Sequence, residues 1–340
     1  TNLAAVEQNR MLMLSTNGLV DNIARVVHNE RSDVARQCSA LAIMNLTYGD
    51  REHVPELAGN ELILETIIKL IRDDDAETRR NAAIALFNVA CADQNTVKLV
   101  RYKGGVILEV LMHCVYPDDG NLPGSKINET NDDVSVNAAE ALFNISCSSI
   151  EETTDRMAQH PRLLETLALT LRSPVASREV KLYCAATLRR IGEIIHAPKR
   201  SQLELLSALV KAASWTRTTC IAEAFLSQSK IATNRPIMVE HHGLLTALSK
   251  QALTMDGVDS DKIRIAAVSA IEHLSREIQA RRILSQHEGI MLAMTRASYL
   301  SGKTGSNRSL VTEDDDSSVT TTTTVNKRIQ MALKQLVGAM

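Results

Sequence analysis

Apolar residues recur along residues 77–95 with the spacing of one broad face of an α-helix. This stretch reads ETRRNAAIALFNVACADQN, and its apolar positions are Ala82, Ala83, Ala85, Leu86, Val89 and Ala90. Small alanines among larger side chains let neighbouring helices approach closely, as stacked helical arrays require. The pattern therefore predicts a long helix that packs against similar helices.

Copies of this helix recur along the chain. Residues 36–49 read RQCSALAIMNLTYG, and residues 137–148 read NAAEALFNISCS. Asn45, Asn88 and Asn144 occupy one register in the three copies, and each is followed by Leu, Val or Ile. Fainter copies place other residues near this position: Arg190, Ser227, His273 and Gln335. A helix repeated in this way predicts an α-solenoid.

Each repeat has one order of elements: a short helix, a turn marked by glycine, a second helix, a capped loop and the long third helix. In the first repeat, Ser32 and Asp33 are the expected cap of the third helix. The expected turn residues are Gly18, Gly59, Gly104, Gly105, Gly243, Gly289 and, in the fourth repeat, Pro161. We expect a single domain over 1–340 with about seven repeats, approximately 6–49, 50–92, 93–149, 150–198, 199–230, 231–278 and 279–340. The fifth repeat offers no clear short first helix.

Two polar segments lengthen the spacing between the turn and the third helix. The distance is 27 residues from Gly18 to Asn45, but 40 residues from Gly104 to Asn144. We interpret residues 117–132 and 302–324 as loop insertions, because the first is rich in Pro, Gly, Asp and Asn and the second in acids and Thr. The second insertion is interpreted as a spacer; a phosphorylated segment or a cover over the basic half is the alternative.

Composition and charge narrow the class of protein. Aromatic residues at 3% and only 14 glycines argue against β-sandwiches and barrels. Residues 1–150 contain 13 Lys and Arg against 21 Asp and Glu, a net charge of −8, whereas residues 151–340 contain 25 against 19, a net charge of +6. This division indicates either a bipolar surface or ordinary solvated helix faces.

The sequence also indicates a location. No apolar run approaches the twenty residues of a membrane span, and the sequence does not begin with a secretory leader. The six cysteines form no CxxC pair, and we expect all six to be reduced and buried. These features predict a cytoplasmic or nuclear protein.

The repeated residues resemble the armadillo-repeat family. ALAIMNL, AIALFNV and EALFNIS match that family's third helix, and the glycine turn after a short first helix differs from the usual HEAT repeat. The resemblance covers nearly the whole chain and implies an all-α fold, an armadillo-type α-solenoid forming a right-handed superhelix of about seven three-helix repeats. It further implies that the third helices line a concave groove for extended peptide segments, whose backbone is bonded by Asn45, Asn88 and Asn144.

Branches of the armadillo-repeat family differ in the residues near the repeated asparagine. The nuclear-import-receptor branch places Trp one helical turn earlier, where this chain has Leu41, Ile84 and Glu140. The only Trp, Trp215, lies elsewhere. The catenin branch prefers a basic groove for acidic ligands, and repeats four to seven could supply such charge.

The chemistry of asparagine suits a peptide clamp. Its amide carries donors and an acceptor, so it can pair with both the C=O and the N–H of a peptide. Asn81 and Asn137 lie seven residues before Asn88 and Asn144, nearly two turns, and should face the same way, with Arg80 nearby. Alternatively, these amides tie adjacent repeats together or face water.

Arg190 is a further candidate for the groove. Together with Arg189 it could grip a carboxylate or phosphate, or it could pair with Glu193 or Glu223.

Catalytic and metal-binding motifs were not found. The sequence has no GxSxG, GxxxxGK[ST] or HExxH motif and no GxGxxG after a strand, which predicts a protein that is not an enzyme and uses no cofactor. His241 and His242 are a poor metal pair because adjacent helical residues diverge and no third ligand has zinc spacing.

The leading hypothesis is a monomeric scaffold or adaptor that binds an extended peptide segment. One alternative is a nuclear-transport or nucleic-acid adaptor that uses the basic C-terminal half. Another is a regulatory section of a larger multidomain protein.

Overall fold

The computed structural model describes residues 2–29, 32–49, 54–116, 129–194, 199–255, 259–306 and 330–338. Within these ranges the regular elements are helices, and no strand is present. The contacts divide the chain into two compact units, Thr1–His196 (unit 1) and Ala197–Met340 (unit 2). Each unit is a stack of helical repeats, so the α-solenoid prediction is confirmed.

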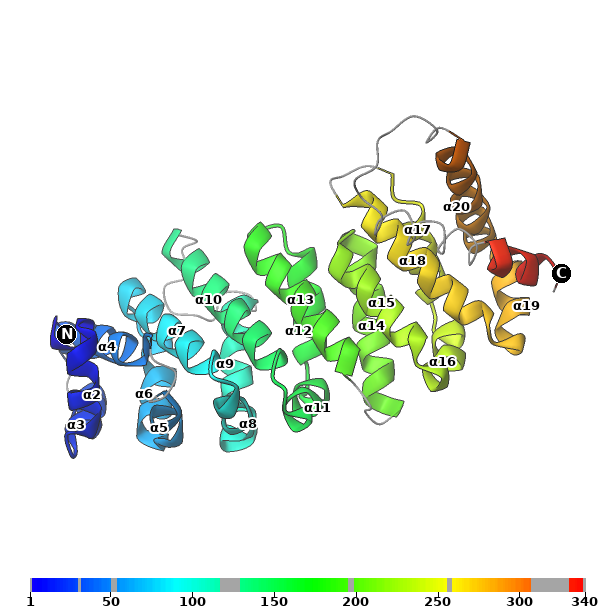
Figure 1. Ribbon diagram of the computed structural model, residues 1–340. Coiled ribbons are helices and arrows are strands. Elements are labelled where there is room, and N and C mark those ends of the chain that lie inside the picture. Colours follow the sequence, from blue (N-terminus) through cyan, green and yellow to red (C-terminus); the bar gives the residue numbers. More distant parts are fainter. Residues whose placement is uncertain are drawn as a thin grey trace. The chain divides into compact units, whose positions relative to one another are not determined.

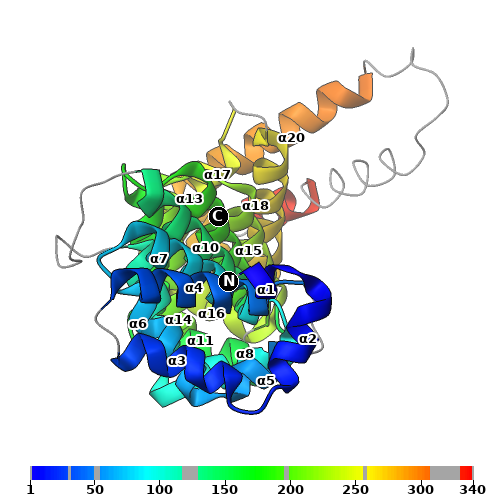
Figure 2. The same cartoon turned by 90° about the vertical axis from the view of Figure 1, so that its left-hand side faces the viewer.

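Unit 1 contains four repeats, and its third helices lie side by side in one row (Figure 1). These third helices are α4 (Asp33–Thr47), α7 (Ala76–Ala90), α10 (Glu129–Ser146) and α13 (Arg178–Ile194). The second helices are α3 (Leu19–Asn29), α6 (Glu61–Ile71), α9 (Val106–Val115) and α12 (Leu163–Arg172). The first helices are α2 (Glu7–Ser15), α5 (Val54–Gly59), α8 (Asp93–Arg101) and α11 (Glu151–Gln159), with the short α1 (Asn2–Ala5) and η1 (Tyr102–Gly104). Figure 2 looks along the stack at the first repeat, where α4 lies above α3 and α2 lies to their right.

The described residues at the start of unit 2 form two helices, α14 (Lys199–Trp215) and α15 (Thr219–Lys230). Among them no short first helix precedes α14, in agreement with the pattern of the fifth repeat. The next repeat consists of η2 (Ala232–Asn234), α16 (Arg235–Glu240), α17 (Leu244–Ala252) and α18 (Ser260–Ser275). It is followed by α19 (Ile278–Gln286), α20 (Glu288–Ser306) and a helical turn over residues 330–337. Equivalent helices pack together, because α15 contacts α18 and α16 contacts α19.

Burial follows the predicted apolar pattern. Ala82, Ala83, Ala85, Leu86, Val89 and Ala90 are at most 2% exposed, and they fix α7 between its neighbours α4 and α10. Ile84 and Phe87 of the same stretch are half-buried. Fully burying a side chain the size of Leu86 or Val89 contributes about 1.5–3 kcal/mol. Side chains cap the N-termini of α4, α6, α7 and α15. The prediction for Ser32 is confirmed, since its Oγ accepts a hydrogen bond from the Ala35 N–H.

The turn between the first and second helix has left-handed backbone in most repeats. Gly18, Gly104, Gly105 and Gly243 have φ between +73° and +108°, a conformation that favours glycine. In the fourth repeat Arg162, with φ of 70°, adopts it in place of the predicted Pro161. The pyrrolidine ring fixes the φ of proline near −65°, so the left-handed residue must be its neighbour.

Two of the predicted turns occur at the expected helix junctions but lack a left-handed glycine. Gly59 lacks positive φ and ends α5, and the side chain of Asn60 then caps α6 by accepting from the Ile63 N–H. Gly289 lies inside α20, where His287 Nδ1 accepts from the Ile290 N–H at 3.3 Å. A capping side chain replaces the left-handed glycine in both repeats.

The boundaries of both insertions need correction. Residues 129–132 already belong to α10, and residues 302–306 belong to α20. Asp, Asn, Thr and Glu are well tolerated in the first turn of a helix, so their polar composition did not reveal the start of α10. Residues 117–128 and 307–324 lie outside the described residues.

Alanine substitution should distinguish turns that contain a left-handed glycine from turns that do not. Gly18→Ala is expected to lower the free energy of unfolding by about 1–2 kcal/mol, because Gly18 has φ of +74° and open space around it, which leaves backbone strain as the cost. Gly59→Ala should change stability little or raise it by up to about 1 kcal/mol, since its φ is not positive. Urea unfolding of both variants measures the difference. Equal losses would contradict the assigned turn conformations.

Candidate binding surface of unit 1

The open side of α4, α7, α10 and α13 forms a surface that we call the third-helix face. Asn45, Asn88 and Asn144 lie on three successive helices of this row, and all three are half-buried. Half-buried apolar side chains accompany them: Leu41, Met44, Ile84, Phe87, Val136, Phe143 and Tyr183. The face therefore combines apolar surface with a recurring carboxamide.

The Asn88 amide bonds to the preceding third helix. Its Nδ2 lies 3.2 Å from Thr47 Oγ1 at the end of α4. The Thr47 hydroxyl donates its own proton to the Met44 carbonyl at 2.8 Å, so toward Asn88 it can only accept. This arrangement fixes the amide orientation, with the nitrogen toward α4.

Asn144 repeats this link one helix further along. Its Nδ2 donates to Cys91 Sγ at 3.3 Å, at the end of α7. Each link uses one of the two amide N–H donors, so the second N–H and the carbonyl oxygen still have bonding capacity. The amides therefore do tie adjacent repeats together, while a peptide clamp remains chemically possible.

The side chains seven residues earlier behave differently. Asn81 is only 6% exposed, so its prediction as a groove residue is wrong. Asn137 has the same seven-residue spacing but is half-buried, so the packing around each helix decides the exposure of this position. Asn137 is half-buried and donates to the Asp133 carbonyl of its own helix at 2.6 Å. Arg80 is exposed and forms an ion pair with Asp133 at 2.9 Å.

Arg190 is engaged within its own helix. Its guanidinium lies 2.9 Å from Glu193, and Arg189 contacts the same carboxylate at 3.3 Å. Of the two partners considered from the sequence, Glu193 is therefore the partner of Arg190.

An aromatic and acidic cluster on this face was missed by the sequence analysis. The rings of Phe143 and Tyr183 lie 5.9 Å apart and are tilted by 42°. Burial, a hydrogen bond to Glu140 and the nearby charges of Glu140 and Glu179 raise the pKa of Tyr183 to about 12. One signal was available, because the residue before the repeated asparagine is aromatic in two repeats, Phe87 and Phe143.

The cysteines depart from the expectation that all six are buried. All six are free, but Cys38 and Cys147 are exposed. Burial raises the pKa of the Cys114 and Cys184 thiols to about 12, so these two stay protonated and inert. Cys38 falls beside the buried stripe of α4, and Cys147 follows the end of α10.

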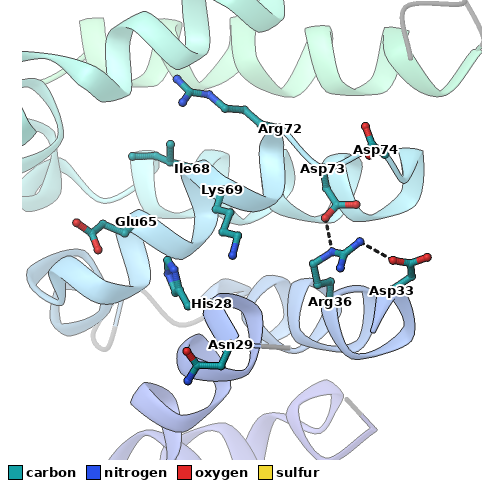
Figure 3. A pocket seen from close by; sticks show the side chains of 10 residues that line it. All are labelled: His28, Asn29, Asp33, Arg36, Glu65, Ile68, Lys69, Arg72, Asp73 and Asp74. Carbon is teal, nitrogen blue, oxygen red and sulfur yellow. Dashed lines mark hydrogen bonds and ion pairs between the residues drawn. The ribbon is translucent and has the colours of Figure 1, made fainter. Parts of the chain in front are cut away.

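A polar pocket of about 700 Å³ lies between the first two repeats (Figure 3). Arg36 forms ion pairs there with Asp73 at 2.6 Å and Asp33 at 2.5 Å. Lys69 Nζ donates to the Val27 carbonyl at 2.8 Å, and His28 Nε2 shares a hydrogen bond with Thr66 at 3.1 Å. These groups link neighbouring repeats, and we assign the pocket a structural role.

Several arginines of unit 2, which belongs to the net positive part of the sequence, form ion pairs. Arg235 pairs with Glu277, Arg264 with Asp261 and Arg276 with Glu272, at 2.6–3.0 Å. In the part of the chain that the structure describes, no group of three or more His, Cys, Asp or Glu could hold a metal ion. None of the described helices has the length and apolar character needed to cross a membrane.

Three solved structures have folds similar to that of this chain. One is an engineered protein that is 18% identical to this chain, with a TM-score of 0.53. The match covers 94% of this chain and 81% of the engineered protein. Another comes from work on a phosphorylation switch that controls the interaction between cadherin and beta-catenin. It is 15% identical to this chain with a TM-score of 0.53, and the match covers 98% of this chain and 72% of the solved chain. The third is an archaeal HEAT-like repeats protein from Thermococcus onnurineus, with a TM-score of 0.50 and 16% identity over 90% of this chain and 99% of its own.

No family model and no curated protein matches the chain. At these identities the structural likeness concerns the fold alone. It agrees with the stacked helices described above, and the class of protein is an α-solenoid of helical repeats.

Proposed function

We propose that this chain is an armadillo-type adaptor that binds an extended peptide segment along the third-helix face of unit 1 and catalyses no reaction. The observation that carries the proposal is the repeated pair Asn88 and Asn144. Both are half-buried on adjacent third helices, and each has one N–H held by the preceding repeat. A carboxamide held in this way is oriented before a ligand arrives, which lowers the entropic cost of binding.

The composition of the face suits an extended backbone. Each amide still has one N–H and one carbonyl oxygen with bonding capacity, the complement of a peptide C=O and N–H. Side chains such as Ile84, Phe87 and Phe143 lie beside the amides and supply apolar surface for alternate side chains of the ligand. Backbone bonding would give affinity, and the apolar neighbours would give specificity.

Two further observations support a protein partner inside the cell. The fold is similar to that of a chain solved in work on the interaction between cadherin and beta-catenin, and that interaction joins two proteins. The exposed free thiols of Cys38 and Cys147 suit a reducing compartment, which favours the cytoplasm or nucleus.

Peptide selection tests the proposal. The 340-residue chain is used to select binders from a phage-displayed library of random dodecapeptides, and fluorescence anisotropy gives their affinities. The double variant Asn88→Ala/Asn144→Ala should bind the selected peptides about 10- to 30-fold more weakly, because each lost hydrogen bond contributes about 0.5–1.5 kcal/mol.

Asn17→Ala is the matched control, since Asn17 is exposed in the turn between α2 and α3, outside the third helices. It should leave affinity unchanged. Selected peptides that bind the double variant as tightly as the wild type would remove the third-helix face as their site.

A further inference from the structure

The cluster around Glu140 joins two neighbouring third helices. Phe143 and Asn144 lie three and four residues after Glu140 on α10, so both are neighbours of Glu140 on the surface of that helix. Tyr183 comes from α13, and its ring lies 5.9 Å from that of Phe143. The cluster thus lies directly beside the Asn144 amide, within the surface proposed to bind a peptide.

The carboxylate of Glu140 has unused acceptor capacity. Tyr183 shares a hydrogen bond with it, and the raised pKa of Tyr183 keeps the phenol protonated, so the phenol donates and the carboxylate accepts. A carboxylate has about four lone-pair sites, and one phenol occupies only one of them.

The charges around the cluster are uncompensated. Glu179 lies one turn before Tyr183 on α13 and is exposed, and its charge acts on Tyr183. Neither Glu140 nor Glu179 forms an ion pair with another described residue. Two other cations of these helices are already paired, Arg80 with Asp133 and Arg190 with Glu193. The centre of the face is therefore negative, next to two aromatic rings.

We infer that Glu140, Phe143 and Tyr183 form a subsite for a lysine or arginine side chain of the bound segment. The inference rests on the proposed function. The aliphatic stem of such a side chain packs on half-buried aromatic surface while its charged end reaches a carboxylate. A cation near the face of Phe or Tyr gains further attraction from the ring quadrupole. The preferred partner of this part of the chain is a basic extended segment.

The test uses fluorescein-labelled synthetic dodecapeptides taken from the selection, each paired with a version in which norleucine replaces every lysine and arginine. Wild-type protein should bind the basic peptides about tenfold more tightly than the norleucine versions, and added salt should reduce the difference. Glu140→Gln should abolish the difference, because it keeps the size of the side chain and an acceptor for Tyr183 but removes the charge. Glu109→Gln on α9, an exposed acid on a second helix, should leave the difference intact.

The possible failures are distinct. If the selection yields no peptides, the proposed function and the subsite both fall. If peptides bind and depend on Asn88 and Asn144, but wild type and Glu140→Gln show equal preference for the basic version, only the subsite is overturned. Comparing two peptides on one variant cancels any loss of folded protein, so misfolding cannot imitate the expected result.

Discussion

Phe225→Ala is expected to lower the free energy of unfolding of unit 2 by about 3–5 kcal/mol. Phe225 is fully buried in α15, the helix of the two-helix repeat that packs on α18. Ala222 of the same helix packs with Ile263 and Ala266 of α18, so little side-chain volume is available to fill the space that a lost ring leaves. Hydrogen exchange of α15 and α18 measures the loss directly.

Phe143→Ala is the comparison for this prediction. Phe143 is also aromatic and lies on a third helix, but it is half-buried, so its truncation opens a smaller void. We expect a loss of about 1–2 kcal/mol, because less area leaves contact and solvent replaces part of it. A loss in Phe225→Ala no larger than in Phe143→Ala would contradict the assigned packing of α15.

Asp75→Ala should destabilise unit 1 by about 2–3 kcal/mol. Asp75 is the N-cap of α7, and its Oδ2 accepts from both the N–H and the hydroxyl of Thr78, each at 2.7 Å. Thr78 is fully buried, so alanine at position 75 leaves its hydroxyl without this partner. Urea unfolding at neutral pH gives the loss.

This loss should also depend on pH. Burial works to raise the pKa of Asp75, but hydrogen bonds from the Thr78 side chain and backbone and from Gln37 outweigh it and hold the pKa below its usual value. The folded pKa is thus lower than the unfolded one, so the stabilisation is present above the unfolded pKa, about 3.9, and disappears as pH falls through the folded pKa.

Wild type and Asp75→Ala should therefore approach each other in stability below about pH 4. Asp75→Asn keeps an acceptor for the Thr78 N–H and should cost only about 0.5–1 kcal/mol, with a smaller pH dependence. A wild-type advantage over Asp75→Ala that persists undiminished in acid would exclude the carboxylate as the stabilising group.

Local patterns predicted the helices well. The buried stripe of α7, the Ser32 cap and the missing first helix of the fifth repeat all followed from sequence alone. Each depends on interactions within a few residues or on the periodicity of one helix, which the sequence displays directly.

The candidate surface was only partly predictable. The repeat register predicted one equivalent position for Asn45, Asn88 and Asn144, and all three are half-buried, whereas Asn81 was wrongly placed on the open face. A register gives the direction of a side chain to within tens of degrees, and the neighbouring helices decide whether that direction is open. The cluster around Tyr183 was missed because its members come from two helices.

The sequence by itself determined that the chain forms repeated helices, where most of them lie and which stripe of each is buried, because these properties arise from backbone geometry and local burial. Tertiary structure alone decided the partners between repeats: the Asn88 amide is turned toward Thr47, and Tyr183 is placed against Phe143. Side chains about 40 residues apart meet only after helices stack, and the hydrogen bonds and charges at that contact depend on the packed geometry.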